Sequence, residues 1–231
     1  MSVLIFDSID GTFGGTARPV SPFTKCVTAY QQFITSPQPD TALAVNPKGL
    51  GEFLAEAKSA GGILSLDIET WPINWSILQA SLGAARAADP ALRISFFGSG
   101  VVTGTMIEQG LAGAPSAFAA AQAIDDSQDA ITTMAMCDFC QPGLYLNSTQ
   151  TMANFLAMAG YTVAQSRRYR KPVYAEVCPF YGDNGVLMPE ADWSNIIWSL
   201  GGIADGLVIW AHIDSAWDES AAWWQALKVM G

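Results

Sequence analysis

The sequence predicts an α/β fold in which parallel strands alternate with helices and close into an irregular (β/α) barrel of the TIM type, with seven to eight strands. Two observations support this prediction. Strand-like runs, several of them apolar on both faces, alternate with helix-like stretches, as in a parallel sheet covered by helices. The chain has 231 residues, half of them hydrophobic, which suits one large core and predicts a single domain over residues 1–231.

The elements follow one another in a regular order. Strands are predicted at residues 3–7, 42–46, 62–69, 93–98, 130–138, 172–178 and 206–212. Helices are predicted between them at residues 47–60, 75–88, 115–126, 148–168, 190–200 and 218–230, with a further helix at 23–34. Asn46 is well placed to cap the helix that begins at residue 47.

A doubly wound open sheet is the alternative to the barrel. Such a sheet commonly binds phosphate through a Gly-rich turn after its first strand. Residues 7–15, Asp-Ser-Ile-Asp-Gly-Thr-Phe-Gly-Gly, match neither the dinucleotide fingerprint nor the P-loop. Seven strand–helix units also fit a closed barrel better than an open sheet.

Composition excludes several partners. The net charge is −10 and charged residues make up only 14% of the chain, so a broad basic surface for nucleic acid is not expected. No apolar run reaches the ~20 residues that span a bilayer, and we expect a soluble protein without membrane contact. The first residues, MSVLIFDSIDG, do not resemble a signal peptide, which predicts a cytoplasmic chain as made, or one delivered by a non-classical or virion route.

The four cysteines are expected to be reduced, structural thiols. Cys137 and Cys140 have the spacing of a redox or metal motif, but no second pair accompanies them. A disulfide and a metal site that also uses Cys178 and His212 are the alternatives. We predict neither a metal nor an organic cofactor.

Two carboxylates stand out at the end of an apolar strand, in Gly62-Ile-Leu-Ser-Leu-Asp-Ile-Glu69. Side chains two apart in a strand point to the same face, so Asp67 and Glu69 are predicted to lie side by side. Two adjacent acids resist ionising together, and one of them should have a raised pKa. A raised pKa is what a general acid requires at neutral pH.

Other strand ends carry acids and aromatic residues, which in a TIM barrel gather at the rim where active sites form. Carboxylates and aromatic faces together suit glycoside cleavage, and Glu176 is a candidate second catalytic acid. Candidate substrate-binding residues are Asp7, Trp71, Asp138, Tyr145, Tyr174, Tyr181, Trp210 and His212. Each has a structural alternative, such as a helix cap for Asp7, an ion pair with a buried Arg for Glu176, and packing for His212 or Trp210.

Leu66-Asp-Ile-Glu-Thr-Trp-Pro72 resembles the strand-end motif of the hyaluronidase family, in which Asp-x-Glu is followed by Trp and a nearby Pro. Leu207-Val-Ile-Trp210 is similar to an apolar-Trp segment that ends a late strand of that family's seven-unit barrel. Residues 172–181 resemble its tyrosine-bearing strand, with Glu176 where Arg is expected. Chitinase-like and lysozyme-like barrels, including phage muramidases, share the Asp-x-Glu strand end.

This resemblance implies a hydrolase that cuts an N-acetylhexosamine-containing polysaccharide. Glu69 would protonate the glycosidic oxygen, and Asp67 would orient the 2-acetamido group of the substrate, whose carbonyl oxygen acts as the nucleophile. Tyr145, Tyr174 or Tyr181 would bind that acetamido group, and Trp210 would form the apolar floor of the subsite.

Two alternatives remain open at this stage. Glu69 and Glu176 are also placed to flank the scissile bond as a pair of catalytic carboxylates, without help from the acetamido group. A carbohydrate-binding or structural module without catalysis, such as a component of a phage particle, is the alternative from another functional class. The small-residue segment 99–116 is a candidate lid or assembly contact.

Overall fold

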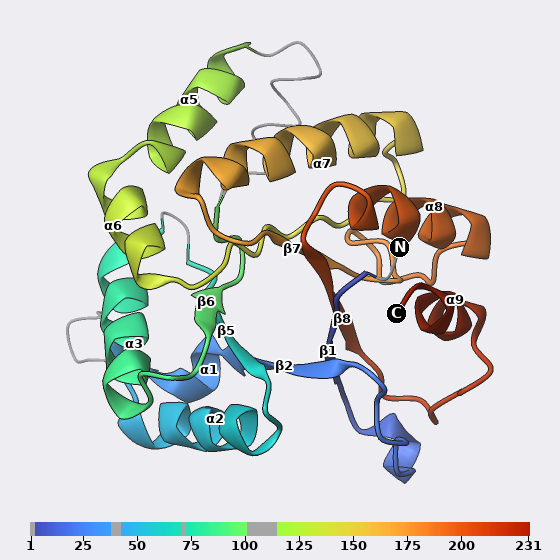
Figure 1. Cartoon of the computed structure of the whole chain (residues 1–231), viewed down its shortest axis with the longest axis horizontal. Coiled ribbons are helices and arrows are strands. Elements are labelled where there is room, and N and C mark those ends of the chain that lie inside the picture. The colour runs from blue at the N-terminus through green and yellow to red at the C-terminus, as the bar shows by residue number, and fades with distance from the viewer. Residues whose placement is uncertain (1–2, 38–42, 71–72, 101–114) are drawn as a thin grey trace.

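The computed structural model describes residues 3–37, 43–70, 73–100 and 115–231. Six parallel strands form a curled sheet with the order β6-β5-β2-β1-β8-β7 (Figure 1). Their bounds are β1 Ile5–Asp10, β2 Thr24–Tyr30, β5 Ile63–Asp67, β6 Ile94–Phe96, β7 Tyr174–Val177 and β8 Gly206–His212. This arrangement confirms the predicted TIM-type barrel.

Residues 138–144 join the two edges of this sheet as an irregular seventh strand. On one side Asp138 N donates to Ile94 O at 2.8 Å and Gly98 N donates to Gln141 O at 2.9 Å. On the other side Tyr174 N donates to Cys140 O at 2.8 Å. The backbone groups of β6 and β7 are therefore paired across the gap, as in a closed barrel.

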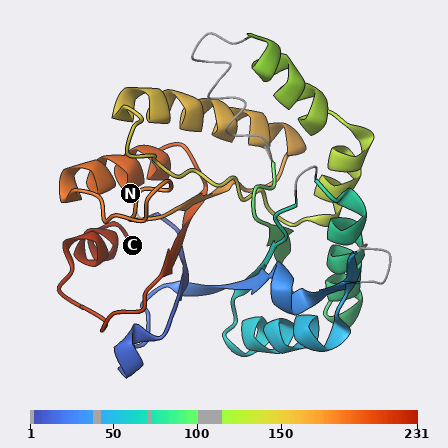
Figure 2. The same ribbon diagram turned by 180° about the vertical axis from the view of Figure 1, so that it is seen from behind.

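Helices pack around the outside of the strands (Figures 1 and 2). They are α2 Pro47–Ser59, α3 Trp75–Ala88, α5 Pro115–Asp125, α6 Gln128–Met136, α7 Met152–Ser166, α8 Glu190–Gly201 and α9 Ala222–Met230. Short turns η1 Phe13–Gly15, α1 Gln31–Ile34 and η2 Arg167–Tyr169 complete the set. Asn46 accepts a hydrogen bond from Gly49 N, so it caps α2 as predicted.

Two predicted elements are wrong, and the strand predicted at residues 42–46 is present but lies outside the barrel. Residues 23–34 form β2 followed by α1, because Thr-Lys-Cys-Val-Thr-Ala-Tyr alternates between the two sheet faces. Residues 130–136 belong to α6, which Ser127 caps and which buries Ala130, Thr133 and Met134 at helical spacing. Residues 42–46 contain β4 Leu43–Val45, which pairs antiparallel with β3 Thr35–Pro37 outside the barrel.

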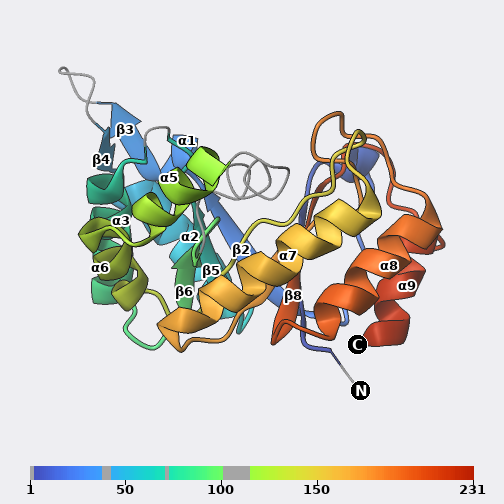
Figure 3. The same ribbon diagram turned by 90° about the horizontal axis from the view of Figure 1, so that it is seen from above.

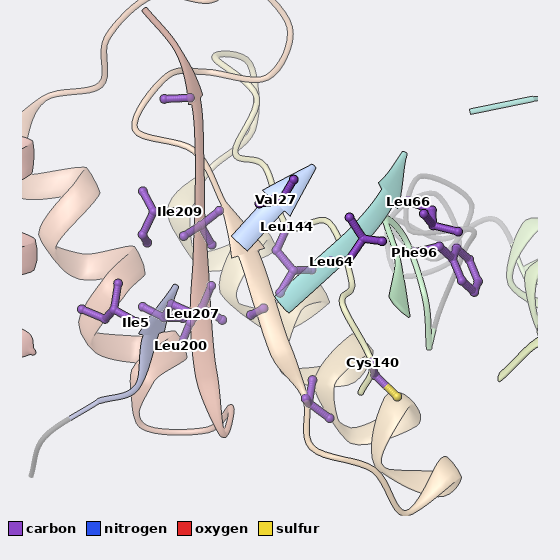
Figure 4. Close-up of a cluster of buried hydrophobic side chains, with 14 of the residues drawn as sticks. Ile5, Val27, Leu64, Leu66, Phe96, Cys140, Leu144, Leu200, Leu207 and Ile209 are labelled. Carbon is purple, nitrogen blue, oxygen red and sulfur yellow. The ribbon is translucent and has the colours of Figure 1, made fainter. Parts of the chain in front are cut away.

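The hydrophobic core has two parts. The larger part lies between the strands and the helices, where Ile5, Val27, Leu64, Leu207 and Ile209 are buried (Figure 4). The smaller part fills the interior of the barrel near the strand starts, and its members are Phe6, Cys26, Ile63, Phe139, Tyr174 and Val208. None of the described helices is long and apolar enough to cross a membrane.

Candidate active site

Inward positions become polar towards the strand ends, above the small apolar cluster. Ser8 and Thr28 share a hydrogen bond of 2.5 Å, and Ser95 Oγ donates to Phe139 O at 2.7 Å. Ser65 lies beside Thr28 and Ser95 in the strand register and is fully buried. Because interiors of TIM barrels are usually filled by branched apolar side chains, this buried polar layer departs from the usual packing of the fold.

Asp67 and Glu69 lie together at the end of β5, and a hydrogen bond joins their side chains. Burial, the negative charge of Glu69 and this hydrogen bond together raise the pKa of Asp67 to about 7. Asp67 Oδ1 is buried and has no hydrogen-bond partner among the described residues. The pair therefore has room for one shared proton and a free acceptor. Trp71, the aromatic residue of the same motif, lies outside the described residues.

Glu176 is buried in β7, with only 4% of its surface exposed. Tyr145 Oη donates to one carboxylate oxygen and Gln141 Nε2 donates to the other. Burial raises the pKa of Glu176 to about 7 against the opposing effect of these two donors, and the charges of Asp67 and Glu69 raise it further. Three carboxyl groups thus share one electrostatic environment.

An aromatic wall connects two pockets at the strand ends. Phe97 and Glu69 line a pocket of about 360 Å³. Tyr145, Tyr181 and Trp210 line another of about 350 Å³, together with Cys178, Phe180 and His212. The ring of Tyr145 stacks on Phe97 at 5.9 Å and lies 6.1 Å from Trp210, so one row of rings spans both pockets. Flat rings in a row are suited to stacking on sugars.

A hydrogen-bonded chain fixes Trp210 at this rim. Its Nε1 donates to Tyr30 Oη at 3.1 Å, and Tyr30 Oη donates to Asp10 at 2.6 Å. Asp10 also binds His212 Nδ1 at 2.7 Å, and His212 Nε2 lies 3.3 Å from Asp214. The hydrogen bond to Asp10 and the charge of Asp10 raise the pKa of His212, although its slight burial opposes this.

Three predicted site residues lie away from this cluster. Asp7 is 1% exposed and forms two hydrogen bonds with Arg18, whose guanidinium lies over Trp217 on the helix side of the sheet. Asp138 pairs with Arg86 at 2.5 Å. It begins the irregular strand instead of ending one, because the preceding residues are helical. Tyr174 belongs to the apolar cluster at the strand starts and bonds Arg93.

The structure adds Tyr30, Asp10 and Gln141 to the site. Tyr30 ends β2 and is the register partner of Asp67. The sequence pattern did not reveal it, because residues 23–34 are predicted to form a helix. Asp10 lies three residues after Asp7 in β1, so its side chain is on the opposite face of the strand and points into the barrel. Gln141 lies in the irregular strand, whose pattern carries no strand signal. The signal in the sequence that could have located Tyr30 is the alternating pattern of Thr-Lys-Cys-Val-Thr-Ala-Tyr, which is typical of a strand.

The cysteines are dispersed and buried in the described structure. All four cysteines are buried and unpaired with one another, and burial raises the pKa of their thiols. Within the described ranges no group of three or more His, Cys, Asp or Glu side chains is arranged to hold a metal ion.

Several solved structures share this fold at low sequence identity. No protein-family profile and no curated protein sequence matches the chain. Bee venom hyaluronidase has a TM-score of 0.57 at 13% identity, with 90% of this chain and 91% of that chain covered. A Cellulomonas fimi endo-β-1,4-mannanase has a TM-score of 0.54 at 10% identity, covering 99% and 70%. Active domain 2 of a Pyrococcus furiosus chitinase has a TM-score of 0.53 at 12% identity, covering 89% and 72%. The chain therefore has a TIM-type barrel fold of the kind found in several glycoside hydrolases.

Proposed function

We propose that this protein is a glycoside hydrolase that cuts an N-acetylhexosamine-containing polysaccharide, with Glu69 as the general acid. The observation that carries the proposal is the hydrogen-bonded pair of Asp67 and Glu69 at a strand end, where the pKa of Asp67 is raised to about 7. The fold is in keeping with this function. A bee venom hyaluronidase of this shape has been solved with a hyaluronic acid tetramer, and the Pyrococcus furiosus chitinase with chito-oligosaccharides.

The chemistry proceeds in two balanced steps. Glu69 donates the proton that it shares with Asp67 to the glycosidic oxygen while the acetamido carbonyl oxygen of the substrate attacks the anomeric carbon, and the bond to the leaving sugar breaks. Asp67, beside Glu69, orients the acetamido group and balances the positive charge of the cyclic intermediate. Water then attacks the anomeric carbon and gives a proton to the Glu69 carboxylate, while the bond from that carbon to the acetamido oxygen breaks and the acetamido group re-forms. The product keeps its original anomeric configuration.

The neighbouring residues take positioning roles in this proposal. Tyr145 supplies its ring to the aromatic row, while its hydroxyl donates to Glu176. Trp210 forms the apolar floor, and the ring of Tyr181 extends the pocket while its hydroxyl stays bonded to Asp192 at 3.3 Å. His212 fixes Trp210 through Asp10 and Tyr30.

Glu176 is less suited to act as the second catalytic carboxylate of a conventional pair. Both of its oxygens accept hydrogen bonds, and the side chain is buried beneath the aromatic row. A nucleophile or base needs a free oxygen within reach of substrate or water. These contacts favour the acetamido-assisted route, in which Glu176 aligns Tyr145.

A carbohydrate-binding module without turnover is the second candidate function. The observation that favours it is the pocket lined by Tyr145, Phe180, Tyr181 and Trp210, which offers sugar-stacking surface that needs no acid. The Asp67 and Glu69 pair supports the hydrolase instead, because a binder has no need for two adjacent acids with a shared proton.

The test is an assay of purified protein on hyaluronan, chondroitin, chitin oligomers and peptidoglycan, with products identified by mass spectrometry. Proton NMR during cleavage gives the anomeric configuration of the first product. We expect retention of configuration and, for Glu176→Gln, substantial remaining activity. Inversion, or loss of activity in Glu176→Gln as large as in Glu69→Gln, would favour the two-carboxylate route. Binding without cleavage of any glycan would favour the binding module.

A further inference from the structure

The cations are strongly segregated between the two ends of the barrel. All eleven Lys and Arg residues lie in the described ranges. All but two of them stand at strand starts or helix ends, which share the face opposite the site: Lys25, Lys58, Arg86, Arg93, Arg167, Arg168, Arg170, Lys171 and Lys228. Figure 3 shows the two faces of the barrel from the side, with the loop after β7 and the turn η1 on one face and the C-terminus on the other.

The two remaining cations do not serve the site. Arg18 is held by Asp7 and stacked on Trp217, with 11% of its side chain exposed. Lys48 is an exposed residue in the first turn of α2. Neither pocket at the strand ends is lined by Lys or Arg. His212 lines one of them, but its two ring nitrogens face Asp10 and Asp214.

The strand-end face carries many carboxyl groups. Asp214 is 66% and Asp10 35% exposed at the side chain, and Asp183 is exposed in the loop after β7 between two glycines that line the aromatic pocket. Within the described ranges these carboxyl groups include Asp10, Asp67, Glu69, Glu176, Asp183, Asp192 and Asp214. A cleft of one charge sign lowers the local concentration of ligands with the same sign and raises that of ligands with the opposite sign.

We propose that the glycan bound at this site bears no carboxylates, and that free amino groups on sugars flanking the cleaved residue strengthen binding. The inference rests on the proposed function, because the sugar at the cut must keep its acetyl group as nucleophile. Uronic acids would bring like charges to Asp10, Asp183 and Asp214 without a cation to receive them. Glucosamine units would bring ammonium groups to the same carboxylates. The predicted substrate class is a chitin-type or partly deacetylated glycan.

The test compares three hexasaccharides of equal length: chitin hexamer, partly deacetylated chitin hexamer and hyaluronan hexamer. Dissociation constants are measured by calorimetry on Glu69→Gln, and cleavage rates on the wild type, at 50 and 500 mM NaCl. At low salt we expect hyaluronan to bind at least tenfold more weakly than chitin hexamer, and the deacetylated hexamer to bind several-fold more tightly. Salt should narrow both differences in affinity, because it shortens the range of charge interactions from about 10 Å at 0.1 M to about 3 Å at 1 M.

A charge reversal supplies the matched control. Asp183→Lys should raise hyaluronan affinity severalfold at low salt, whereas Glu52→Lys, on the outer helix α2, gives the same change in net charge and should leave it unaltered. Hyaluronan binding as tight as chitin binding at 50 mM NaCl overturns the inference and leaves the proposed function standing. The expected order of affinities without any cleavage upholds the inference and refutes the hydrolase.

Discussion

The buried Glu176 should destabilise the folded protein at alkaline pH, and Glu176→Gln should remove that effect. Burial raises the pKa of Glu176 from 4.5 to about 7, so the folded state binds this proton more tightly than the unfolded chain does. The stability from this group is fully present below pH 4.5 and is lost as pH rises through 7. A shift of this size corresponds to about 3 kcal/mol, since one pKa unit is ~1.4 kcal/mol.

Glutamine should fit the same hydrogen-bond network without the charge. Its amide oxygen accepts the bond from Tyr145, and its amide nitrogen donates to Gln141 Oε1, which has no partner among the described residues, once the Gln141 amide turns over. We therefore compare the free energies of unfolding of Glu176→Gln and the wild type. The difference in favour of Glu176→Gln should be up to about 3 kcal/mol larger at pH 8.5 than at pH 4.5. For a chain of this length that corresponds to a rise of about 6–12 °C in Tm.

Urea unfolding followed by tryptophan fluorescence at pH 4.5, 6.5 and 8.5 measures the change. Glu52→Gln is the control, because this glutamate is exposed on α2 and loses no burial penalty. A stability difference between Glu176→Gln and wild type that does not grow with pH would refute the assignment of Glu176 as a buried carboxyl with a raised pKa.

Three further predictions concern the site and the core. Because the pKa of Asp67 is about 7, kcat/KM should fall above pH 7 as the pair with Glu69 loses its shared proton, and an unchanged rate up to pH 9 would contradict this. His212→Ala should raise KM more than it lowers kcat, because it removes the His212 bond to Asp10 from the hydrogen-bonded chain that holds Trp210. Steady-state kinetics measures both constants, and His212→Gln should restore KM in part. Leu207→Ala should cost about 2–5 kcal/mol in urea unfolding, because this fully buried side chain fills space between strand and helix; a cost below 1 kcal/mol would show the core is packed differently.

Much of the barrel could be predicted from local pattern. β5 and β8 are continuous apolar runs, and α2 has a recognisable cap in Asn46, so each was located to within a few residues. β2 and α6 were not located in this way. The alternating pattern of β2 and the helical spacing of α6 are short, and both compete with neighbouring signals. The irregular strand 138–144 exists only because two sheet edges need hydrogen-bond partners, which no local pattern reveals.

The site was predictable where one strand supplied it. Asp67 and Glu69 are two residues apart, and strand geometry alone brings them together. Asp7 was expected at the end of its strand, but β1 continues to Asp10. Asp138 and Tyr174 form hydrogen bonds with Arg86 and Arg93, which lie 52 and 81 residues away in the chain. Pairings of that kind arise from tertiary packing alone.

The central claim is that Glu69 is the general acid, and the most direct measurement is the cleavage rate of Glu69→Gln beside the wild type on whichever glycan the wild type cuts. Glutamine keeps the size and hydrogen-bonding capacity of the side chain but has no proton to give. We predict a loss of about 10²–10⁴-fold in kcat with little change in substrate affinity. Full activity of Glu69→Gln on that substrate would contradict the account.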